Sequence, residues 1–387
     1  MEIKIVLGHT FGDEGKGVTV QWLCKKAIEE GKKPLVVRFS GGPQAAHTIF
    51  NGRTEHICSS FGSGVLLGVP TMYTHDVYVD PICLVNELHA LKDKGVNPVL
   101  YMSAHRVITP YDVIAGRESE RVRKDGTCGK GIYATFNRYK YAGSFERVLF
   151  SKYNCIEAKR MLEVAKKFYP ADGMEEYEEM FKKACLEIAT EVQFLPNTSE
   201  YDVLIFEGTQ GLLLDMDRGF YPNVTPSQVG LNGILSDYLK DAEVYLVTRT
   251  YTTRHGNGYE PKSPIRFYYN INDKYESNVN NEFQGEFKTG ILEFELLNIA
   301  YNRHCIDNYA HKYNMSVNLV ITHMDVLEEG EHYNFDFIDN VGLSHSCSMN
   351  KKWAIEEIGK YFMNNLCYKP DHVYYNDSVE SNIKQLR

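Results

Sequence analysis

Residues 3–17 read IKIVLGHTFGDEGKG, in which a short apolar run is followed by a glycine-rich turn and a charged Asp-Glu-Gly-Lys sequence. The apolar run predicts a strand. The glycines allow backbone N–H groups to approach a polyphosphate, and the positive end of the following helix would face the same anion. The phosphate-binding pattern GxxxxGK[ST] is not met, because the chain has Thr10 and Gly17 at two of its fixed positions. Taken alone, the stretch fits either a nucleotide-binding loop or an ordinary tight strand-to-helix turn.

Similar apolar runs recur along the chain and set the fold class. Runs such as DVLIF and VNLVIT do not alternate with polar residues, as expected for strands covered on both faces of a mainly parallel sheet. Helical patterns lie between the runs, and residues 155–193 predict two helices separated by YPADG. We predict an α/β fold with a mainly parallel central sheet flanked by helices, in one elaborated domain over residues 1–387. The predicted strands are 3–7, 35–39, 98–102, 202–206, 243–249, 317–322 and 373–375.

The composition argues against several classes of partner. The formal charge of −9 disfavours a nucleic-acid partner, although local basic pockets for phosphates remain compatible with it. The nine cysteines include no CxxC pair and fit reduced thiols better than disulfides or a zinc site. No apolar stretch approaches membrane-spanning length. We therefore expect a cytoplasmic protein, in the host cytoplasm if it is viral, with no nucleic-acid and no membrane partner.

Three segments that follow predicted strands are expected to be loops that hold ligands, because open α/β sheets bind ligands at the carboxyl ends of their strands. They are residues 40–48, 207–211 and 250–258. In the first, RFSGGPQAAHT, His47 could act as a general acid near neutral pH or could be a structural histidine.

Further candidates follow the later strands. Gln210 lies in a tight Gly-x-Gln-Gly turn and could read a purine edge through its amide, although a plain hairpin fits equally. Thr225 could bind a phosphate, and Arg254 could grip a ribose or a phosphate. Asp325 follows a buried strand, where it could accept donors from a nucleobase or cap a helix.

Taken together and in this order, the motifs GDEGKG, GGxxAxHT, FEGxQGxLLDxDxGxYPxVT and YTTRxGxG resemble the adenylosuccinate synthetase family. The resemblance spans most of the chain. The family joins L-aspartate to C6 of a 6-oxopurine nucleotide at the expense of a nucleoside triphosphate, with Mg²⁺. The resemblance therefore implies a P-loop-NTPase-like adenylosuccinate synthetase fold, a carbon–nitrogen ligase and a Mg²⁺ cofactor.

The resemblance also implies residue roles. Asp13 would remove the purine N1 proton so that the 6-oxygen attacks the γ-phosphate, and His47 would donate toward the leaving diphosphate. Lys16 would hold the phosphates, and Gln210 would lie beside the base. Mg²⁺ would bind Asp13 and the backbone carbonyl of Ala46. The remaining residues for the triphosphate would be Gly12, Glu14, Gly15, Gly17 and Thr48, with His323 and Asp325 at its base.

The acceptor monophosphate would lie against a further group of residues. In the family an arginine of the neighbouring subunit also reaches its phosphate, which implies a homodimer with shared active sites. The matching stretch here is NRYKYAG, where either Arg138 or Lys140 could serve. The other residues implied for the acceptor are Gln44, Thr127, Cys128, Gln210, Thr225 and His255.

Several positions depart from the family pattern. The loop that clamps aspartate is shortened to QGEFK, where Lys288 would be the cation for a carboxylate, beside Gln284 and Gly285. A lysine cannot supply the bidentate fork of an arginine. The family reads guanine of GTP with Lys-x-Asp and Ser-Thr-Gly-Pro, and here these are His323-Met324-Asp325 and Asn376-Asp377-Ser378. ATP and GTP therefore both stay open as the energy donor.

The short aspartate loop and the altered GTP-reading residues are similar to the viral 2-amino-2′-deoxyadenylosuccinate synthase branch of the family. That branch joins aspartate to dGMP with ATP or dATP and makes N6-succino-2-amino-2′-deoxyadenylate. Gln44 in place of asparagine and His255 in place of a small apolar residue also alter the acceptor pocket. Asp13 points the other way, because several members of that branch carry a smaller residue there. The alternatives are a synthetase that uses IMP and GTP, an inactive nucleotide-binding regulator and a generic NTPase.

Overall fold

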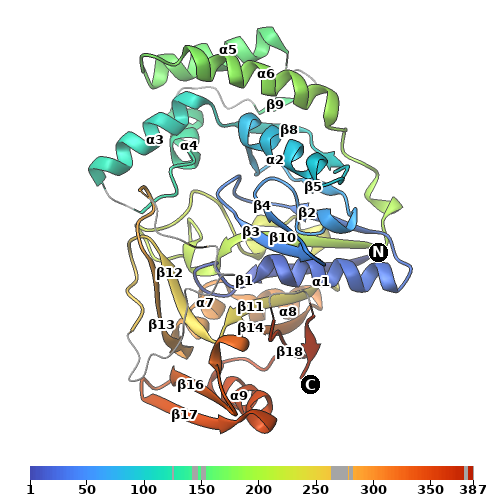
Figure 1. Ribbon diagram of the computed structural model, residues 1–387, viewed down its shortest axis with the longest axis vertical. Helices are drawn as coiled ribbons and strands as arrows, with labels where there is room; N and C mark the ends of the chain where they lie inside the picture. Colours follow the sequence, from blue (N-terminus) through green and yellow to red (C-terminus); the bar gives the residue numbers. More distant parts are fainter. Residues whose placement is uncertain are drawn as a thin grey trace.

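The computed structural model describes residues 1–123, 126–141, 147–149, 154–262, 278, 282–378 and 382–386. In these residues the chain forms a nine-stranded central sheet with the order β19-β18-β14-β11-β1-β10-β2-β5-β7. Neighbouring strands are parallel except for β19, which is antiparallel to β18. The predicted α/β class with a mainly parallel sheet is therefore confirmed (Figure 1).

All seven predicted strands lie in this sheet. They are β1 (Glu2–Gly8), β2 (Pro34–Arg38), β7 (Leu100–Tyr101), β10 (Val203–Gly211), β11 (Glu243–Arg249), β14 (Ser316–Thr322) and β18 (Val373–Tyr375). The two strands of this sheet that the sequence did not reveal are β5 (Thr71–Tyr73) and β19 (Lys384–Gln385).

The central strands lack alternation because both of their faces are covered. On β2, Leu35 faces one apolar cluster and Val36 faces another on the opposite side of the sheet. The second cluster includes Val20, Leu23, Cys24 and Ala27 of α1 (Lys16–Glu29), so this helix packs on that face. The sheet core thereby fixes the start of α1 directly after the glycine-rich turn.

The remaining elements surround this sheet, and none of the described helices has both the length and the apolar character needed to cross a membrane. Helices α5 and α6 lie at one end of the molecule, and β16, β17 and α9 lie at the other (Figure 1). That all parts fold as one domain stays a prediction. The other helices are α2 (Pro81–Asp93), α3 (Pro110–Arg123), α4 (Ile132–Tyr141), α5 (Cys155–Phe168), α6 (Glu175–Glu191), α7 (Phe294–Arg303), α8 (Ile306–Tyr313) and α9 (Lys351–Asn365). The other strands are β3 (His47–Asn51), β4 (Thr54–Cys58), β6 (Tyr78–Val79), β8 (Ala104–Val107), β9 (Val148–Leu149), β12 (Tyr251–His255), β13 (Phe287–Glu293), β15 (Glu328–Glu329), β16 (His332–Ile338) and β17 (Ser344–Asn350).

Two of the three expected loops are wrong in conformation. Residues 207–211 continue β10, because Gly211 still pairs with Gly8 of β1 after a register shift. Most of 250–258 is β12, which pairs with β13 from Tyr251 opposite Ile291 to His255 opposite Phe287. The remaining expected loop, residues 40–48, is irregular until β3 begins at His47.

Candidate active site

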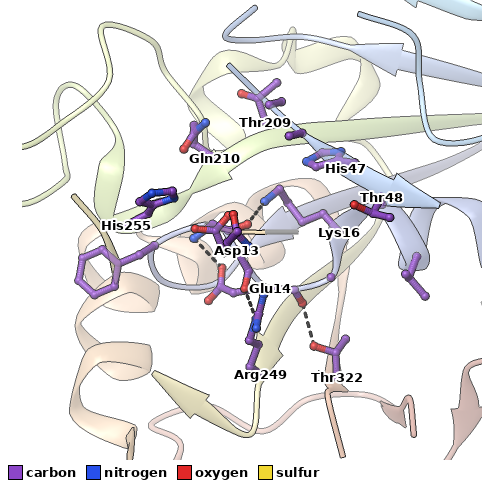
Figure 2. Close-up of a pocket in the computed structure, with 18 of the residues that line it drawn as sticks. Asp13, Glu14, Lys16, His47, Thr48, Thr209, Gln210, Arg249, His255 and Thr322 are labelled. Carbon is purple, nitrogen blue, oxygen red and sulfur yellow. Dashed lines mark hydrogen bonds between the residues drawn. The ribbon is translucent and has the colours of Figure 1, made fainter. Parts of the chain in front are cut away.

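A cavity of about 500 Å³ lies where β1, β10, β11 and β14 end. The turn after β1 supplies Asp13 and Lys16, β10 supplies Gln210, β11 supplies Arg249 and β14 supplies Thr322. Figure 2 shows these side chains around one space, with His47 and Thr48 on one side of Lys16 and His255 on the other side of Asp13. The carboxyl ends of neighbouring parallel strands are the usual place for a ligand in an open α/β sheet.

Glu14 shapes the turn from inside. One oxygen of its buried carboxylate accepts from the Thr10 N–H at 2.7 Å and the Thr10 hydroxyl at 2.6 Å, and the other accepts from the Gly12 N–H at 3.1 Å. Burial raises the pKa of Glu14, which Lys16 and these donors only partly oppose. The side chain is therefore committed to the loop, and only the backbone N–H of Glu14 could serve a phosphate as predicted.

Two glycines of the turn are required by close approach. Gly12 has a φ of +105°, and a Cβ there would lie 2.7 Å from the backbone nitrogen of Gly211. A Cβ on Gly17 would lie 2.7 Å from the Cβ of His47. The first glycine lets the turn cross over the end of β10, and the second brings the start of α1 against His47.

Lys16 and two strand-end residues fix the turn from outside. Lys16 is 1% exposed and donates to the Gly12 carbonyl. Burial lowers the pKa of Lys16, against the opposing effect of the Glu14, Asp13 and Glu207 carboxylates. Arg249 donates from Nε to the Asp13 carbonyl, and the Thr322 hydroxyl donates to the Glu14 carbonyl at 2.9 Å (Figure 2). The turn is thus held in shape before any ligand binds.

His47 is oriented by a buried carboxylate on β10. Its Nδ1 donates to Glu207 Oε1 at 2.5 Å, and Ser63 donates to the same carboxylate from Oγ at 2.5 Å and from its backbone N–H at 3.0 Å. The other ring nitrogen, Nε2, is buried and has no hydrogen-bond partner among the described residues. Since His47 lines the cavity, the ring is held with Nε2 available to a ligand.

Burial sets the charge state of this pair. It lowers the pKa of His47, against the hydrogen bond and the charge of Glu207. Burial would raise the pKa of Glu207, but the hydrogen bond and charge of His47 and the charge of Arg38 outweigh it, so that pKa lies below its ordinary value. The pair is therefore a neutral imidazole hydrogen-bonded to a carboxylate near pH 7.

Most of the residues that the sequence singled out line this cavity. Asp13 and His47, which come from two separate glycine-rich segments, both face it, with no ion pair on the Asp13 carboxylate in the described part of the chain. The predicted residues in its wall are Gly12, Asp13, Glu14, Gly15, Lys16, Gly17, Gln44, Ala46, His47, Thr48, Cys128, Gln210, Arg254, His255, Gln284, His323 and Asp325. The predicted residues outside its wall are Thr127, Thr225, Arg138, Lys140, Gly285 and Lys288.

Arg138 does not reach outward. It is buried and makes a bidentate ion pair with Asp112, at 2.8 Å for both contacts, and donates to the Val107 carbonyl at 2.8 Å. This contact argues against the prediction that Arg138 extends to a neighbouring subunit, because its guanidinium neutralises a buried carboxylate of its own chain. Of the two alternatives, the exposed Lys140 remains.

We predict that Arg138→Met lowers the free energy of unfolding by about 3–5 kcal/mol, because it leaves the buried Asp112 carboxylate without its counter-charge. Urea denaturation measures the change. The matched variant Lys140→Met, two residues along the same helix on an exposed side chain, should unfold like the parent protein. Wild-type stability of Arg138→Met would contradict the assigned ion pair.

Lys288 lies outside the cavity wall. Its Nζ lies 2.6 Å from Glu260, and neither residue is in the cavity wall. In the β12–β13 pair Lys288 lies directly opposite Arg254, which does line the cavity, as does Gln284. That Lys288 supplies the cation for a carboxylate therefore stays a prediction, since in this conformation it pairs with the exposed Glu260 outside the cavity wall.

Several wall residues escaped the sequence analysis. Thr209 lies near the end of β10, Arg249 ends β11 and Thr322 ends β14. Their shared signal is a polar residue at the carboxyl end of a buried parallel strand. Lys130 was also missed, as was Tyr251, although Tyr251 opens the motif YTTRxGxG.

The far end of the cavity wall combines His323 and Asp325 with Asn376 and Ser378. His323 has a φ of +57° and hydrogen-bonds from Nδ1 to the Thr322 hydroxyl at 2.8 Å. Burial, with a smaller contribution from the charge of Arg249, holds the pKa of His323 well below its ordinary value. The ring is neutral there, and with its proton on Nδ1 it offers Nε2 as an acceptor toward a nucleobase.

A buried cluster of His56, Cys58 and Glu87 brings potential metal ligands within 4.8 Å of one another. Glu87 already accepts hydrogen bonds from the backbone of Ser60 and Phe61 and from His56 at 3.3 Å. Burial raises the pKa of Cys58 well above its ordinary value, so the thiol stays protonated. We interpret this cluster as a brace for the chain after β4.

Comparison with known proteins agrees with these features. The family model for adenylosuccinate synthetase matches residues 5–334. The adenylosuccinate synthetase of Thermodesulfovibrio yellowstonii is 30% identical over 282 residues, and that of Streptomyces griseus is 32% identical over 284 residues. Each match covers 67% of this chain and 64% of the relative, so it spans less than two thirds of the relatives' length.

Two solved structures share the fold. Fully ligated adenylosuccinate synthetase from Plasmodium falciparum superposes with a TM-score of 0.74 at 19% identity, over 100% of both chains. Cyanophage S-2L succinoaminodeoxyadenylate synthetase, bound to dGMP and to dATP as an energy donor, superposes with a TM-score of 0.62 at 14% identity, over 99% of this chain and 95% of that one. From the family model, the curated relatives and the shared fold, the chain belongs to the adenylosuccinate synthetase family.

Proposed function

We propose that this protein is a carbon–nitrogen ligase that joins L-aspartate to C6 of a 6-oxopurine nucleotide through a 6-phosphoryl intermediate. The observation that carries the proposal is the meeting of Asp13, Lys16 and His47 in one cavity (Figure 2). A carboxylate, a phosphate-binding cation and an oriented imidazole are the groups that this reaction needs at one purine.

The residues divide the work between two steps. Asp13 takes the N1 proton of the purine, so that charge builds on the 6-oxygen, which attacks the γ-phosphorus of the triphosphate. His47, which takes up a proton on Nε2 when the anionic nucleotides bind, donates that proton toward the leaving diphosphate, with its ring held by Glu207. The amine of aspartate then displaces the 6-phosphoryl group as inorganic phosphate and forms the new C–N bond.

The wall of the cavity also suits Mg²⁺. This ion prefers oxygen ligands and is usually bound by one or two carboxylates together with substrate phosphates. The Asp13 carboxylate and the backbone of Ala46 both line the cavity and would hold it. When bound, Mg²⁺ neutralises negative charge on the transferring phosphoryl group.

We propose dGMP as the acceptor and ATP or dATP as the donor. Both polar atoms of the Gln44 amide are buried and lack hydrogen-bond partners in the described residues, although the residue lines the cavity. A guanine carries a 2-amino donor that hypoxanthine lacks, and the amide oxygen can accept from it. The absence of the guanine-reading Lys-x-Asp at 323–325 supports an adenine donor. A synthetase that uses IMP and GTP is the second candidate, favoured by the retained Asp13.

Product analysis tests this proposal. The protein is incubated with L-aspartate, Mg²⁺, ATP or GTP, and one of IMP, GMP and dGMP. The products are then separated, identified by mass spectrometry and quantified. The largest yield is expected with dGMP and ATP. A larger yield with IMP would overturn the acceptor assignment. No succinylated product in any combination would overturn the ligase function and favour a nucleotide-binding regulator, whereas phosphate release without aspartate would indicate an NTPase.

We further propose a homodimer in which Lys140 of one subunit reaches the acceptor phosphate of the other. The support is that Lys140 is exposed on α4, outside the wall of its own cavity, whereas Arg138 is occupied. Mixing inactive subunits that lack Asp13 with subunits that lack Lys140 should restore activity at shared sites.

A further inference from the structure

Arg254 is a buried cation in the cavity wall. It lies on β12, is 7% exposed and lines the cavity beside His255 and Gln284. Its Nη2 donates to the Asn257 carbonyl at 2.5 Å, and its Nε has no hydrogen-bond partner in the described part of the chain. Burial lowers the pKa of Arg254 to about 10, and among the described residues the Asp13 carboxylate offsets part of this effect. The guanidinium is therefore charged at neutral pH and has an unused donor.

The carboxylates of Glu260 and Glu293 do not neutralise Arg254. Glu260 pairs with Lys288 at 2.6 Å. Glu293 pairs with Lys262 at 3.0 Å and accepts from the Tyr259 hydroxyl at 2.6 Å. A buried charge without a counter-charge is costly, so the site favours an anionic ligand group.

An aromatic surface lies beside the guanidinium. Its central carbon lies 5.5 Å from the centroid of the Phe11 ring, and that ring stacks on Tyr259 at 5.5 Å with an interplanar angle of 21°. A planar fork held in one orientation suits a carboxylate, which it can bind through two parallel hydrogen bonds.

Each anionic group of the proposed substrates can be matched to a part of the cavity wall. The triphosphate has the turn after β1 with Lys16, and the acceptor phosphate has the turn that carries Cys128 and Lys130. The carboxylates of aspartate remain. The shortened loop assigned to aspartate leads directly into β13, and of its residues Gln284 lines the cavity whereas Lys288 does not.

We propose that Arg254 binds a carboxylate of L-aspartate and is the residue of this chain that selects the amino-acid substrate. This rests on the proposed ligase function. The position directly opposite Lys288 on the β12–β13 ribbon explains how the chain keeps a cation at this subsite although its aspartate loop is short.

The test compares Arg254→Gln with Lys288→Gln, which removes the same charge from the opposite strand outside the cavity. Initial rates are measured at varied aspartate concentration, with saturating concentrations of the purine monophosphate and the triphosphate that the wild-type enzyme prefers. Arg254→Gln should raise the KM for aspartate about 10- to 100-fold, the effect of losing a charge-assisted hydrogen bond, and leave the KM values of both nucleotides nearly unchanged. Lys288→Gln should keep the wild-type KM for aspartate. Arg254→Lys, which keeps the charge and loses the fork, should lie between the two.

Each other result overturns the proposal. A raised KM for the purine monophosphate with an unchanged KM for aspartate would assign Arg254 to the acceptor phosphate. Equal effects of Arg254→Gln and Lys288→Gln would remove the special role of the cavity position. If Arg254→Gln does not fold, Arg254→Lys decides, and a wild-type KM for aspartate in that variant refutes the fork. Product from the wild type with any of these failures leaves the ligase function standing, whereas no product from the wild type overturns both.

Discussion

Asp13→Asn should reduce the rate of product formation by at least 10²–10⁴-fold, the typical contribution of a positioned base, while both nucleotides still bind within a few-fold of their wild-type affinity. The amide keeps the shape of the carboxylate but cannot accept the N1 proton. The turn should keep its conformation, because it is held through the Asp13 carbonyl and the Glu14 side chain, neither of which the substitution changes. Single-turnover product formation and calorimetric binding of the monophosphate measure the two quantities.

Asp325→Asn is the matched control for that variant, because it makes the same chemical change at the other end of the cavity wall. It should raise the KM for the triphosphate and leave the rate at saturation nearly intact. A wild-type rate for Asp13→Asn would show that another group takes the N1 proton and that the proposed first step is wrong.

His47→Asn should slow the phosphoryl step by roughly 10²–10⁴-fold through loss of the positioned acid. The pH dependence gives a sharper test. His47 donates only while it is protonated, so activity should fall as pH rises through its pKa in the nucleotide-bound enzyme. Glu207 raises that pKa against burial, so Glu207→Gln should move the alkaline fall of kcat to lower pH. The pH profile of kcat measures both effects.

The outcomes for these two variants differ in kind. His47→Asn should remove the alkaline fall that belongs to His47, whereas Glu207→Gln should keep it and shift it. An alkaline fall at the wild-type position in Glu207→Gln would show that the carboxylate does not control the imidazole. A loss of binding in either variant, without a loss of rate at saturation, would assign the pair to substrate binding alone.

The central sheet could be read from the sequence because burial on both faces leaves continuous apolar runs. The β12–β13 ribbon could not, since it joins Tyr251–His255 to a strand that begins at Phe287. The contacts of individual side chains could not be predicted from the sequence for the same reason. Nothing near Arg138 in the chain signals its ion pair with Asp112, 26 residues away, and nothing near Lys288 signals Glu260.

The cavity residues divide into those found by motif and those found only by folding. The motifs revealed Asp13, Lys16 and His47 because their glycines are local requirements. Glu207 stands in one of the motifs, but its role depends on a contact with His47 across 160 positions of the chain. Arg249 matters because β11 happens to lie beside β1, an order that no local pattern contains.

The residues that hold the glycine-rich turn differ from those that would contact the nucleobase of the triphosphate. The turn that would carry the chemistry is braced by Arg249 and Thr322 at the ends of β11 and β14, whereas the candidate nucleobase contacts lie in the segments that follow β14 and β18. A change from one nucleoside triphosphate to another as energy donor would then require substitutions only in those two segments, and the reacting groups could stay as they are. Related proteins can therefore evolve a different phosphate donor while they keep the same catalytic residues.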